Sequence, residues 1–185
     1  MKCLILDRDG VINQDSDAFV KSAAEWLPIA GSIEAIAAFT RAGYRIFVAT
    51  NQSGLGRGLF DASALLAMHQ KMNALVNGAG GRIDGIFYCP HTPDDGCDCR
   101  KPLPGLIDQI EHSVGQSLAG SPIVGDSLRD LEAGMARDCL PVLVKTGKGS
   151  KTLAKLQADK HPLLDQLTIA ESLADYASSV LGGEQ

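Results

Sequence analysis

The chain has 185 residues, of which 45% are hydrophobic and 21% are charged, so it can bury a sizeable core and does not belong to the disordered class. Its net charge of -5, with no cluster of Lys and Arg among aromatic residues, argues against a nucleic acid partner. Neither a signal-peptide pattern nor a run of ~20 apolar residues is present. We therefore expect a cytoplasmic monomer that binds neither nucleic acid nor a membrane.

Short apolar runs alternate with amphipathic stripes along the chain. Runs rich in Ile, Val, Phe and Leu predict strands over residues 3–6, 45–49, 83–88, 122–124 and 141–144. Helical stripes are predicted over 33–40 before Gly43, over 65–76 after an Asp61 cap, over 106–118, and over 128–135 after a Ser127–Asp130 capping pair. The alternation predicts an α/β fold with a parallel sheet and helices on both faces, in a single domain over 1–185 with a frayed end at 182–185.

Polar residues stand at the ends of several predicted strands. Asp7 and Asp9 follow the first strand, residues 50–53 the second and Asp126 the fourth, while Lys101 precedes a helix. Ligands of an open parallel sheet bind outside the carboxyl ends of its strands, so these side chains are expected to meet. Three acids can hold a magnesium ion, and a hydroxyl and a lysine can hold phosphate oxygens. Each piece alone also fits a polar turn, a cap or a solvated charge, but together they predict phosphoryl transfer.

Four segments resemble motifs of the haloacid dehalogenase (HAD) superfamily of aspartate-nucleophile phosphatases. They are DRDG (7–10), ATNQSG (49–54), CRKP (99–102) and GDSLRD (125–130). The resemblance implies a Rossmann-like HAD fold in which Asp7 attacks phosphorus, while Asp9 protonates the leaving oxygen and then activates water. It also implies that Thr50 and Lys101 stabilise the transferring phosphoryl group.

The same resemblance implies a magnesium site. The ligands are Asp7, the main-chain oxygen of Asp9, and Asp126, and the ion neutralises the nucleophile and the phosphate so that two anions can approach each other. Asp130 fits both a role behind the metal and a helix cap, so no role is assigned to it.

Three cysteines and a histidine crowd into eleven residues. Cys89 and His91 form one pair, Cys97 and Cys99 a second, and five residues separate the pairs. Four protein ligands can close tetrahedrally around Zn²⁺ and leave no open position, so the pattern predicts a structural zinc site that staples this loop. The other histidines, 69, 112 and 161, are interpreted as structural or solvated.

The zinc loop next to CRKP narrows the resemblance to the D,D-heptose 1,7-bisphosphate 7-phosphatases and the histidinol-phosphatases. Residues 13–19, with Asn13, Asp15 and Phe19, match a substrate-contacting flap of the family. Four further residues match its substrate positions, namely Asn51, Gln52, Ser53 and Arg100. Ser127 is a further substrate position, and some members carry Lys there. No insertion between the motifs is long enough for a separate cap domain.

The resemblance implies a small phosphorylated sugar as substrate. We expect hydrolysis of the 7-phosphate of D-glycero-β-D-manno-heptose 1,7-bisphosphate, a step toward nucleotide-activated heptose for lipopolysaccharide. Arg100 favours this anionic sugar over cationic histidinol phosphate, which is the alternative together with the α-anomer. From other classes, a phosphomutase and a non-catalytic, zinc-stapled phosphate-binding module stay open.

Overall fold

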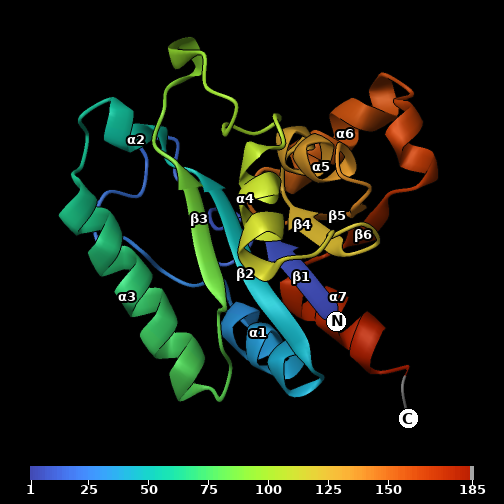
Figure 1. Cartoon of the computed structure of the whole chain (residues 1–185). Helices are drawn as coiled ribbons and strands as arrows, with labels where there is room; N and C mark the ends of the chain where they lie inside the picture. The colour runs from blue at the N-terminus through green and yellow to red at the C-terminus, as the bar shows by residue number, and fades with distance from the viewer. Residues whose placement is uncertain (184–185) are drawn as a thin grey trace.

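The computed structural model describes residues 1–183, in which a central sheet is flanked by helices (Figure 1). The strands are β1 (Lys2–Leu6), β2 (Tyr44–Asn51), β3 (Gly85–Cys89), β4 (Pro122–Gly125), β5 (Leu140–Val144) and β6 (Thr168–Ala170). The α-helices are α1 (Ser32–Arg41), α2 (Ser53–Gly56), α3 (Ala62–Gly78), α4 (Gly105–Val114), α5 (Leu128–Met135), α6 (Gly149–Ala158) and α7 (Leu173–Leu181). Two 3₁₀ turns, η1 (Pro93–Asp95) and η2 (Pro162–Asp165), complete them. Residues 184–185 of the expected frayed end lie outside the described residues.

All six strands pair in parallel, in the order β3-β2-β1-β4-β5-β6. The predicted parallel sheet is thereby confirmed. The order reverses between β1 and β4, because the chain builds one half of the sheet outward from β1 and then returns to its other side. Such a switch point leaves a crevice at the carboxyl ends of the strands, where ligands of this architecture bind.

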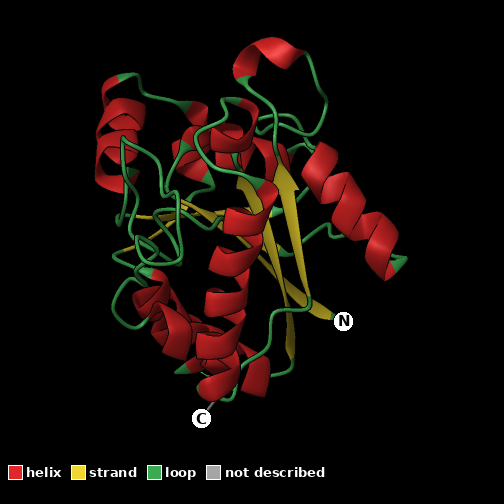
Figure 2. Cartoon of the chain, turned by 90° about the vertical axis from the view of Figure 1, so that its left-hand side faces the viewer, coloured by secondary structure: helices red, strands yellow, loops and turns green. Residues whose placement is uncertain are grey.

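Helices cover both faces of the sheet, as Figures 1 and 2 show. Successive side chains of β1 point to opposite faces: Leu4 and Leu6 pack in the core under α1, α3 and α7, while Cys3 and Ile5 pack in the core under α4. A third apolar cluster joins α5 and α6 to β5. Burial on both faces explains why the strands are continuous apolar runs rather than alternating patterns.

Local geometry differs from the prediction in a few places. The helix predicted over 106–118 ends at Val114, because Gly115 takes a left-handed conformation with φ 69° and stops it. Leu118 is still completely buried, so its place in the apolar stripe reflects core packing after the helix. Asp61 caps α3 as predicted, since its carboxylate accepts a hydrogen bond from the Ala64 amide. Strand β6 and helices α6 and α7 were not predicted.

Two connections bound the carboxyl edge of the sheet. Residues 7–31 join β1 to α1 and are fixed by isolated bridges between Asp9 and Asn13 and between Asn13 and Pro28. Residues 90–104 join β3 to α4 and contain η1. Within the described residues, no helix is both long and apolar enough to cross a membrane.

Candidate active site

A cavity of about 200 Å³ opens at the carboxyl edge of the sheet. All four predicted catalytic residues line it, together with every predicted substrate residue except Asn13, which is completely buried. The other lining residues are Ser16, Asp17, Val20, Asp126, Arg129, Asp130 and Lys148. The fold thus brings residues from all four recognised motifs and the flap into one place.

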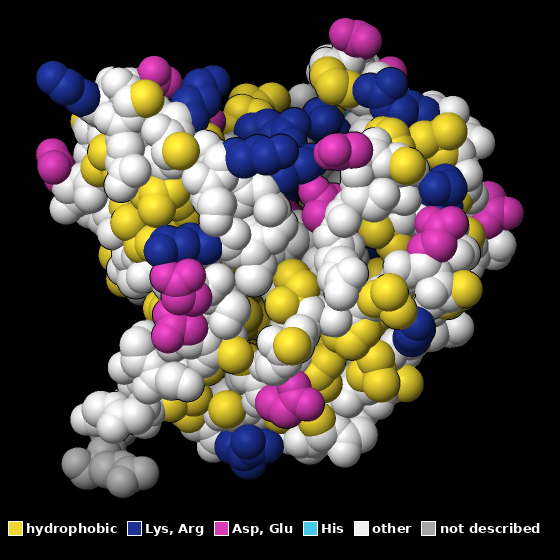
Figure 3. Space-filling view, turned by 180° about the vertical axis from the view of Figure 1, so that it is seen from behind, with side chains coloured by type: hydrophobic (Ala, Val, Ile, Leu, Met, Phe, Trp, Pro, Cys, Tyr) yellow, Lys and Arg dark blue, Asp and Glu magenta, His cyan; other side chains and the backbone are white. Residues whose placement is uncertain are grey.

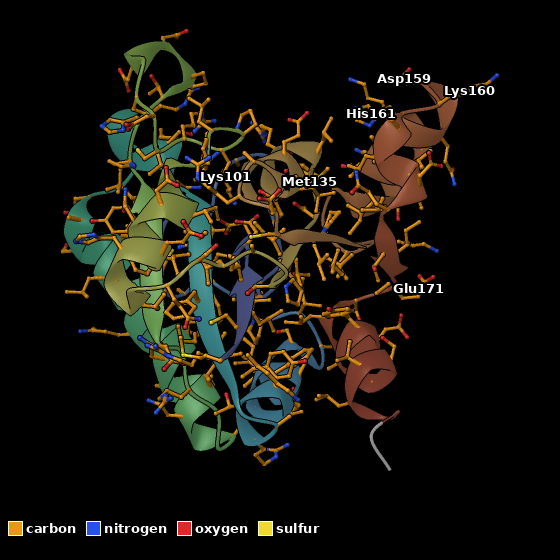
Figure 4. The ribbon with its side chains drawn as sticks, turned by 45° about the vertical axis from the view of Figure 1, so that its right-hand side comes forward. Lys101, Met135, Asp159, Lys160, His161 and Glu171 are labelled. Atoms are coloured by element: carbon orange, nitrogen blue, oxygen red, sulfur yellow. The ribbon has the colours of Figure 1, made fainter. Side chains whose placement is uncertain are left out.

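Lys101 lies beside the carboxyl ends of the central strands, far from His161 at the end of α6 (Figure 4). It is 2% exposed, and its ammonium nitrogen lies 2.8 Å from Asp7 Oδ1, 2.7 Å from Asp130 Oδ1 and 2.7 Å from the Ala49 carbonyl oxygen. Burial alone lowers the pKa of a lysine, but Asp130 and Asp7 raise the pKa of Lys101 above its ordinary value. Lys101 therefore holds a fixed positive charge next to Asp7.

The carboxylates of Asp7, Asp126 and Asp130 lie close together, with one oxygen from each within 4.8 Å of the others. Burial first and the charge of Asp130 next raise the pKa of Asp7 well above its usual range, and the same causes raise the pKa of Asp126 to about 7. Burial has the same effect on Asp130, but Lys101 outweighs it and lowers the pKa of Asp130. Asp7 and Asp126 are thus two buried acids whose charges lack full compensation.

A divalent cation fits this pair of acids. Carboxylate oxygens are hard ligands of the kind Mg²⁺ prefers, and a cation between Asp7 and Asp126 stabilises their ionised forms. The carboxylate of Asp126 packs against the backbone of Gly10, and only glycine leaves room for it there, since a Cβ at position 10 would lie 2.1 Å from Asp126 Oδ2. Asp130 already accepts hydrogen bonds from Ser127 and pairs with Lys101, so its oxygens are engaged.

The carboxylate of Asp9 belongs to a different network. Its oxygens accept from Arg8 Nη2 at 3.0 and 3.1 Å, from Asn13 Nδ2 at 2.9 Å and from Gln52 Nε2 at 2.8 Å. Burial alone raises the pKa of a carboxyl group, but Arg8 and these hydrogen bonds lower the pKa of Asp9. The Asp9 side chain is therefore outside the acid cluster, and only its main-chain oxygen stays a predicted magnesium ligand.

Arg8 is a residue of this site that the sequence reasoning missed. It is completely buried, and besides Asp9 it contacts Gln52 Oε1 at 3.2 Å and His69 Nε2 at 3.3 Å. Burial, followed by the charge of Arg8, lowers the pKa of His69 to about 4, so the ring is neutral near pH 7 and can accept from the guanidinium. The sequence feature that could have indicated this role is the position of Arg8 between Asp7 and Asp9, directly after a buried strand.

The polar residues that end β2 support the charged ones. Thr50 is 1% exposed, and its hydroxyl accepts from Gln52 Nε2 at 2.9 Å. Gln52 thereby links Thr50 to Asp9. Asn51 lines the cavity and bonds to the backbone of Lys101, and Ser53 lines the cavity as the first residue of α2.

The flap is tied to the loop after β5. Lys148 Nζ lies 3.1 Å from Asp15 Oδ2 and 3.9 Å from Asp17 Oδ1, and the Lys148 amide donates to Asp126 Oδ2 at 2.7 Å. Phe19 closes the flap in a left-handed conformation with φ 64°. Sequence reasoning missed Lys148, although the run TGKG (146–149) begins two residues after the predicted strand 141–144 and could have been recognised as another strand end.

Arginines gather at the mouth of the cavity. Arg100 donates to the His91 carbonyl at 3.2 Å, and its pKa is lowered by burial and then by the nearby charge of Arg129. Arg57 lies over the Phe19 ring, 6.0 Å from the ring centroid. At the top of Figure 3, Lys and Arg side chains surround a hollow in which acidic side chains are visible. The opening is thus cationic above an acidic interior.

The four predicted zinc ligands also come together. Cys89 Sγ lies 3.2 Å from Cys99 Sγ and 3.7 Å from Cys97 Sγ, and His91 Nδ1 lies 3.3 Å from Cys99 Sγ. Ligands around a tetrahedral zinc are separated by roughly 3.8 Å when the Zn–S bonds are about 2.3 Å, so the cluster is close to the required size. Burial raises the pKa of Cys99 to about 12, a cost that a bound cation removes by stabilising the thiolate.

Comparisons with known proteins agree with this geometry. The HAD-hydrolase-like family model matches residues 98–170. A D-glycero-beta-D-manno-heptose-1,7-bisphosphate 7-phosphatase from Pseudomonas aeruginosa is 54% identical, over 96% of this chain and 97% of its own. A protein of the same name from Neisseria meningitidis serogroup B is 50% identical, over 98% of this chain and 95% of its own. The crystal structure of a D,D-heptose 1,7-bisphosphate phosphatase from B. bronchiseptica, complexed with magnesium and phosphate, matches with a TM-score of 0.93 and 52% identity, over 99% of both chains.

Proposed function

Because this chain belongs to the D-glycero-beta-D-manno-heptose-1,7-bisphosphate 7-phosphatase family of HAD-like hydrolases, we propose that it removes the 7-phosphate of that sugar bisphosphate through an aspartyl phosphate on Asp7. The observation that carries this mechanism is the buried pair of Asp7 and Lys101 beside Asp126. The pair supports the proposal because Asp7 would serve as the nucleophile, Lys101 would bind the phosphate, and both side chains line one small cavity. The family is one of phosphoric monoester hydrolases, so a phosphomutase and a non-catalytic module are set aside.

In the first step, an oxygen of Asp7 attacks the phosphorus of the 7-phosphate. The bond between phosphorus and the sugar O7 breaks, and Asp9 gives its proton to O7. The sugar 1-phosphate leaves, and Asp7 carries the phosphoryl group. Lys101 and Thr50 line the same cavity and would hold the oxygens of that group.

In the second step, Asp9 takes a proton from a water molecule whose oxygen attacks the same phosphorus. The bond to Asp7 breaks, inorganic phosphate leaves, and the Asp7 carboxylate is restored. Arg8, Asn13 and Gln52 stabilise the ionised form of Asp9, which is the form this step uses.

Two metal ions belong to the proposal. Asp7, Asp126 and the main-chain oxygen of Asp9 would hold Mg²⁺, which neutralises charge on the nucleophile and on the phosphate. Magnesium and phosphate in the B. bronchiseptica enzyme support this role. Cys89, His91, Cys97 and Cys99 would hold structural Zn²⁺, a site that needs reduced thiols and therefore fits the cytoplasm.

We propose that this reaction is a step in the synthesis of nucleotide-activated heptose for lipopolysaccharide. The test is phosphate release from a panel of the β-anomer, the α-anomer and histidinol phosphate, with and without magnesium. We expect kcat/KM for the β-anomer to exceed that for histidinol phosphate at least roughly tenfold, which corresponds to about 1.4 kcal/mol. Chelation should stop turnover and magnesium should restore it. A preference for histidinol phosphate would overturn the proposed substrate.

A further inference from the structure

Helix α3 buries a histidine within an apolar stripe. The buried residues of this helix are Leu65, Met68, His69, Met72 and Val76. His69 is 7% exposed, and its ring Nε2 lies 3.3 Å from Nη1 of Arg8, which is completely buried. Burying a polar side chain without a hydrogen bond costs free energy, so this contact accounts for a histidine at that place. It also joins α3 to the segment that carries the catalytic acids.

The contact between His69 and Arg8 determines which atom of each partner takes part. An arginine side chain can only donate, so His69 accepts through Nε2 and carries its proton on Nδ1. The Nη2 group of Arg8 donates to both carboxylate oxygens of Asp9, at 3.0 and 3.1 Å. A planar guanidinium group that is held at both of its amino groups has a fixed orientation. His69 thus sets the direction from which Arg8 meets Asp9.

Arg8 also determines the orientation of the Gln52 amide. The Nη2 group of Arg8 donates to Gln52 Oε1 at 3.2 Å, which leaves Gln52 Nε2 to donate to Asp9 Oδ2 at 2.8 Å. If the amide were reversed, its NH₂ group would face the guanidinium and its carbonyl oxygen would face the carboxylate, and both contacts would be repulsive. Arg8 therefore directs both its own donor and that of Gln52 toward Asp9.

We propose that His69 is a positioning residue of the reaction, which acts through Arg8 to hold Asp9 in the orientation from which it gives its proton to the leaving oxygen. This role rests on the proposed function, in which Asp9 protonates the sugar O7 as the bond between phosphorus and O7 breaks. Proton transfer of this kind contributes about 10²- to 10⁴-fold to the rate and depends on where the acid lies. His69 and Arg8 are absent from the described residues that line the cavity, so neither is assigned a contact with the substrate.

Two substrates with different leaving groups separate this role from a structural one. The sugar leaves as an alcohol and needs a proton on O7, whereas p-nitrophenolate leaves p-nitrophenyl phosphate without one. In His69→Leu, kcat/KM for the heptose bisphosphate should fall at least roughly tenfold, while kcat/KM for p-nitrophenyl phosphate should stay within about threefold of wild type. His69→Gln, whose Oε1 can accept from Arg8, should recover part of the loss. Equal losses on both substrates, or no loss on either, would overturn the positioning role.

Met72→Ala is the matched control for stability, because Met72 is completely buried in the apolar core on the same helix. The cavity that it leaves should lower the melting temperature and should not change the ratio of the two kcat/KM values. A ratio that falls as far in Met72→Ala as in His69→Leu would overturn the role of His69.

A double variant tests whether His69 acts through Arg8. Residues that act as one unit have effects that do not add, so His69→Leu should cost less than about twofold further in kcat/KM for the bisphosphate once Arg8→Lys is present. Losses that multiply in the double variant would overturn the action through Arg8.

Nitrogen-15 NMR of the histidine rings tests the contact without turnover. The His69 resonances near pH 7, assigned by their absence in His69→Gln, should show the proton on Nδ1 and an accepting Nε2. A proton on Nε2 would overturn the positioning role even in a fully active enzyme. The proposed function fails by a different result, namely wild type that does not hydrolyse the bisphosphate, or Asp9→Asn that loses kcat/KM by the same factor on both substrates.

Discussion

The side-chain amide of Asn51 holds the backbone of Lys101 from both sides. Asn51 Oδ1 accepts from the Lys101 amide at 3.0 Å, and Asn51 Nδ2 donates to the Lys101 carbonyl at 3.1 Å. These residues are fifty positions apart, and the two bonds join the end of β2 to the segment before α4. The position of the Lys101 ammonium next to Asp7 therefore depends on a residue that sequence motifs assign to the substrate.

Replacing Asn51 by Ala should misplace Lys101. Because a shift of about 1 Å in a phosphate-stabilising group can cost on the order of 10²-fold in rate, we expect kcat to fall roughly 10- to 100-fold, with a smaller change in KM. Steady-state kinetics on the bisphosphate measure both constants. Asn77→Ala, at an exposed asparagine of α3, is the control. A change confined to KM would assign Asn51 to substrate contact alone.

Asp7→Asn should abolish turnover without unfolding the protein, because an amide cannot be the anionic nucleophile. The pKa of Asp7 is raised by burial and by Asp130, so the folded state disfavours its charge in the absence of metal. The neutral amide should therefore keep or raise the melting temperature in metal-free buffer. Thermal denaturation with and without magnesium checks this. A large loss of stability in the metal-free variant would contradict the electrostatic account.

Buried His69 should make stability depend on pH. Its pKa is lowered to about 4 in the folded protein, against an ordinary value of about 6.5, so the unfolded chain binds the proton more readily. The contribution of neutral His69 to the free energy of unfolding is therefore present above about pH 6.5 and is lost as the pH falls toward 4. Between pH 7 and pH 5, the free energy of unfolding should fall by on the order of 2 kcal/mol through this residue.

Urea unfolding of wild type and His69→Gln at both pH values measures this term. Between pH 7 and pH 5, the free energy of unfolding should fall less in His69→Gln than in wild type. The effect of the carboxylates, which both proteins share, cancels in this comparison. His112→Gln, at an exposed histidine, should follow wild type. Parallel pH dependence in wild type and His69→Gln would refute the assignment.

Loss of zinc from the loop 89–99 should lower activity because Lys101, two residues after Cys99, would be displaced. Cys97→Ala leaves three protein ligands, so zinc should be lost or weakly held, the melting temperature should fall, and kcat/KM should drop roughly 10- to 100-fold. The magnesium requirement should stay, since Asp7 and Asp126 lie on other strand ends. Metal analysis should find about one zinc per chain in wild type and in the control Cys139→Ala, whose thiol is buried elsewhere. Fully active, fully stable zinc-free wild type would contradict the structural role.

Site residues that a local sequence pattern identifies could be predicted. Asp7 and Asp9 directly follow an apolar strand, and the predicted zinc ligands Cys89 and Cys99 fall within eleven residues. Buried parallel strands are continuous apolar runs, so most of the sheet was visible as well. Strand β6 was not, because it has three residues, of which two are exposed.

Contacts between distant segments could not be predicted. Arg8 reaches His69, which is sixty-one positions away, and nothing in either segment indicates that pairing. Lys148 meets the flap only because the loop after β5 folds back over β1. Tertiary packing decides these contacts, and one sequence does not contain a local signal for them.

The central claim is that Asp7 carries the phosphoryl group during turnover. The measurement that tests it most directly is borohydride trapping of wild type during hydrolysis of the bisphosphate, followed by peptide mass spectrometry. An aspartyl phosphate is reduced to homoserine, so the account predicts homoserine at position 7, dependent on substrate and magnesium and absent in Asp9→Asn that cannot start the reaction. Steady phosphate release with an unmodified Asp7, or with the label on another residue, would contradict it.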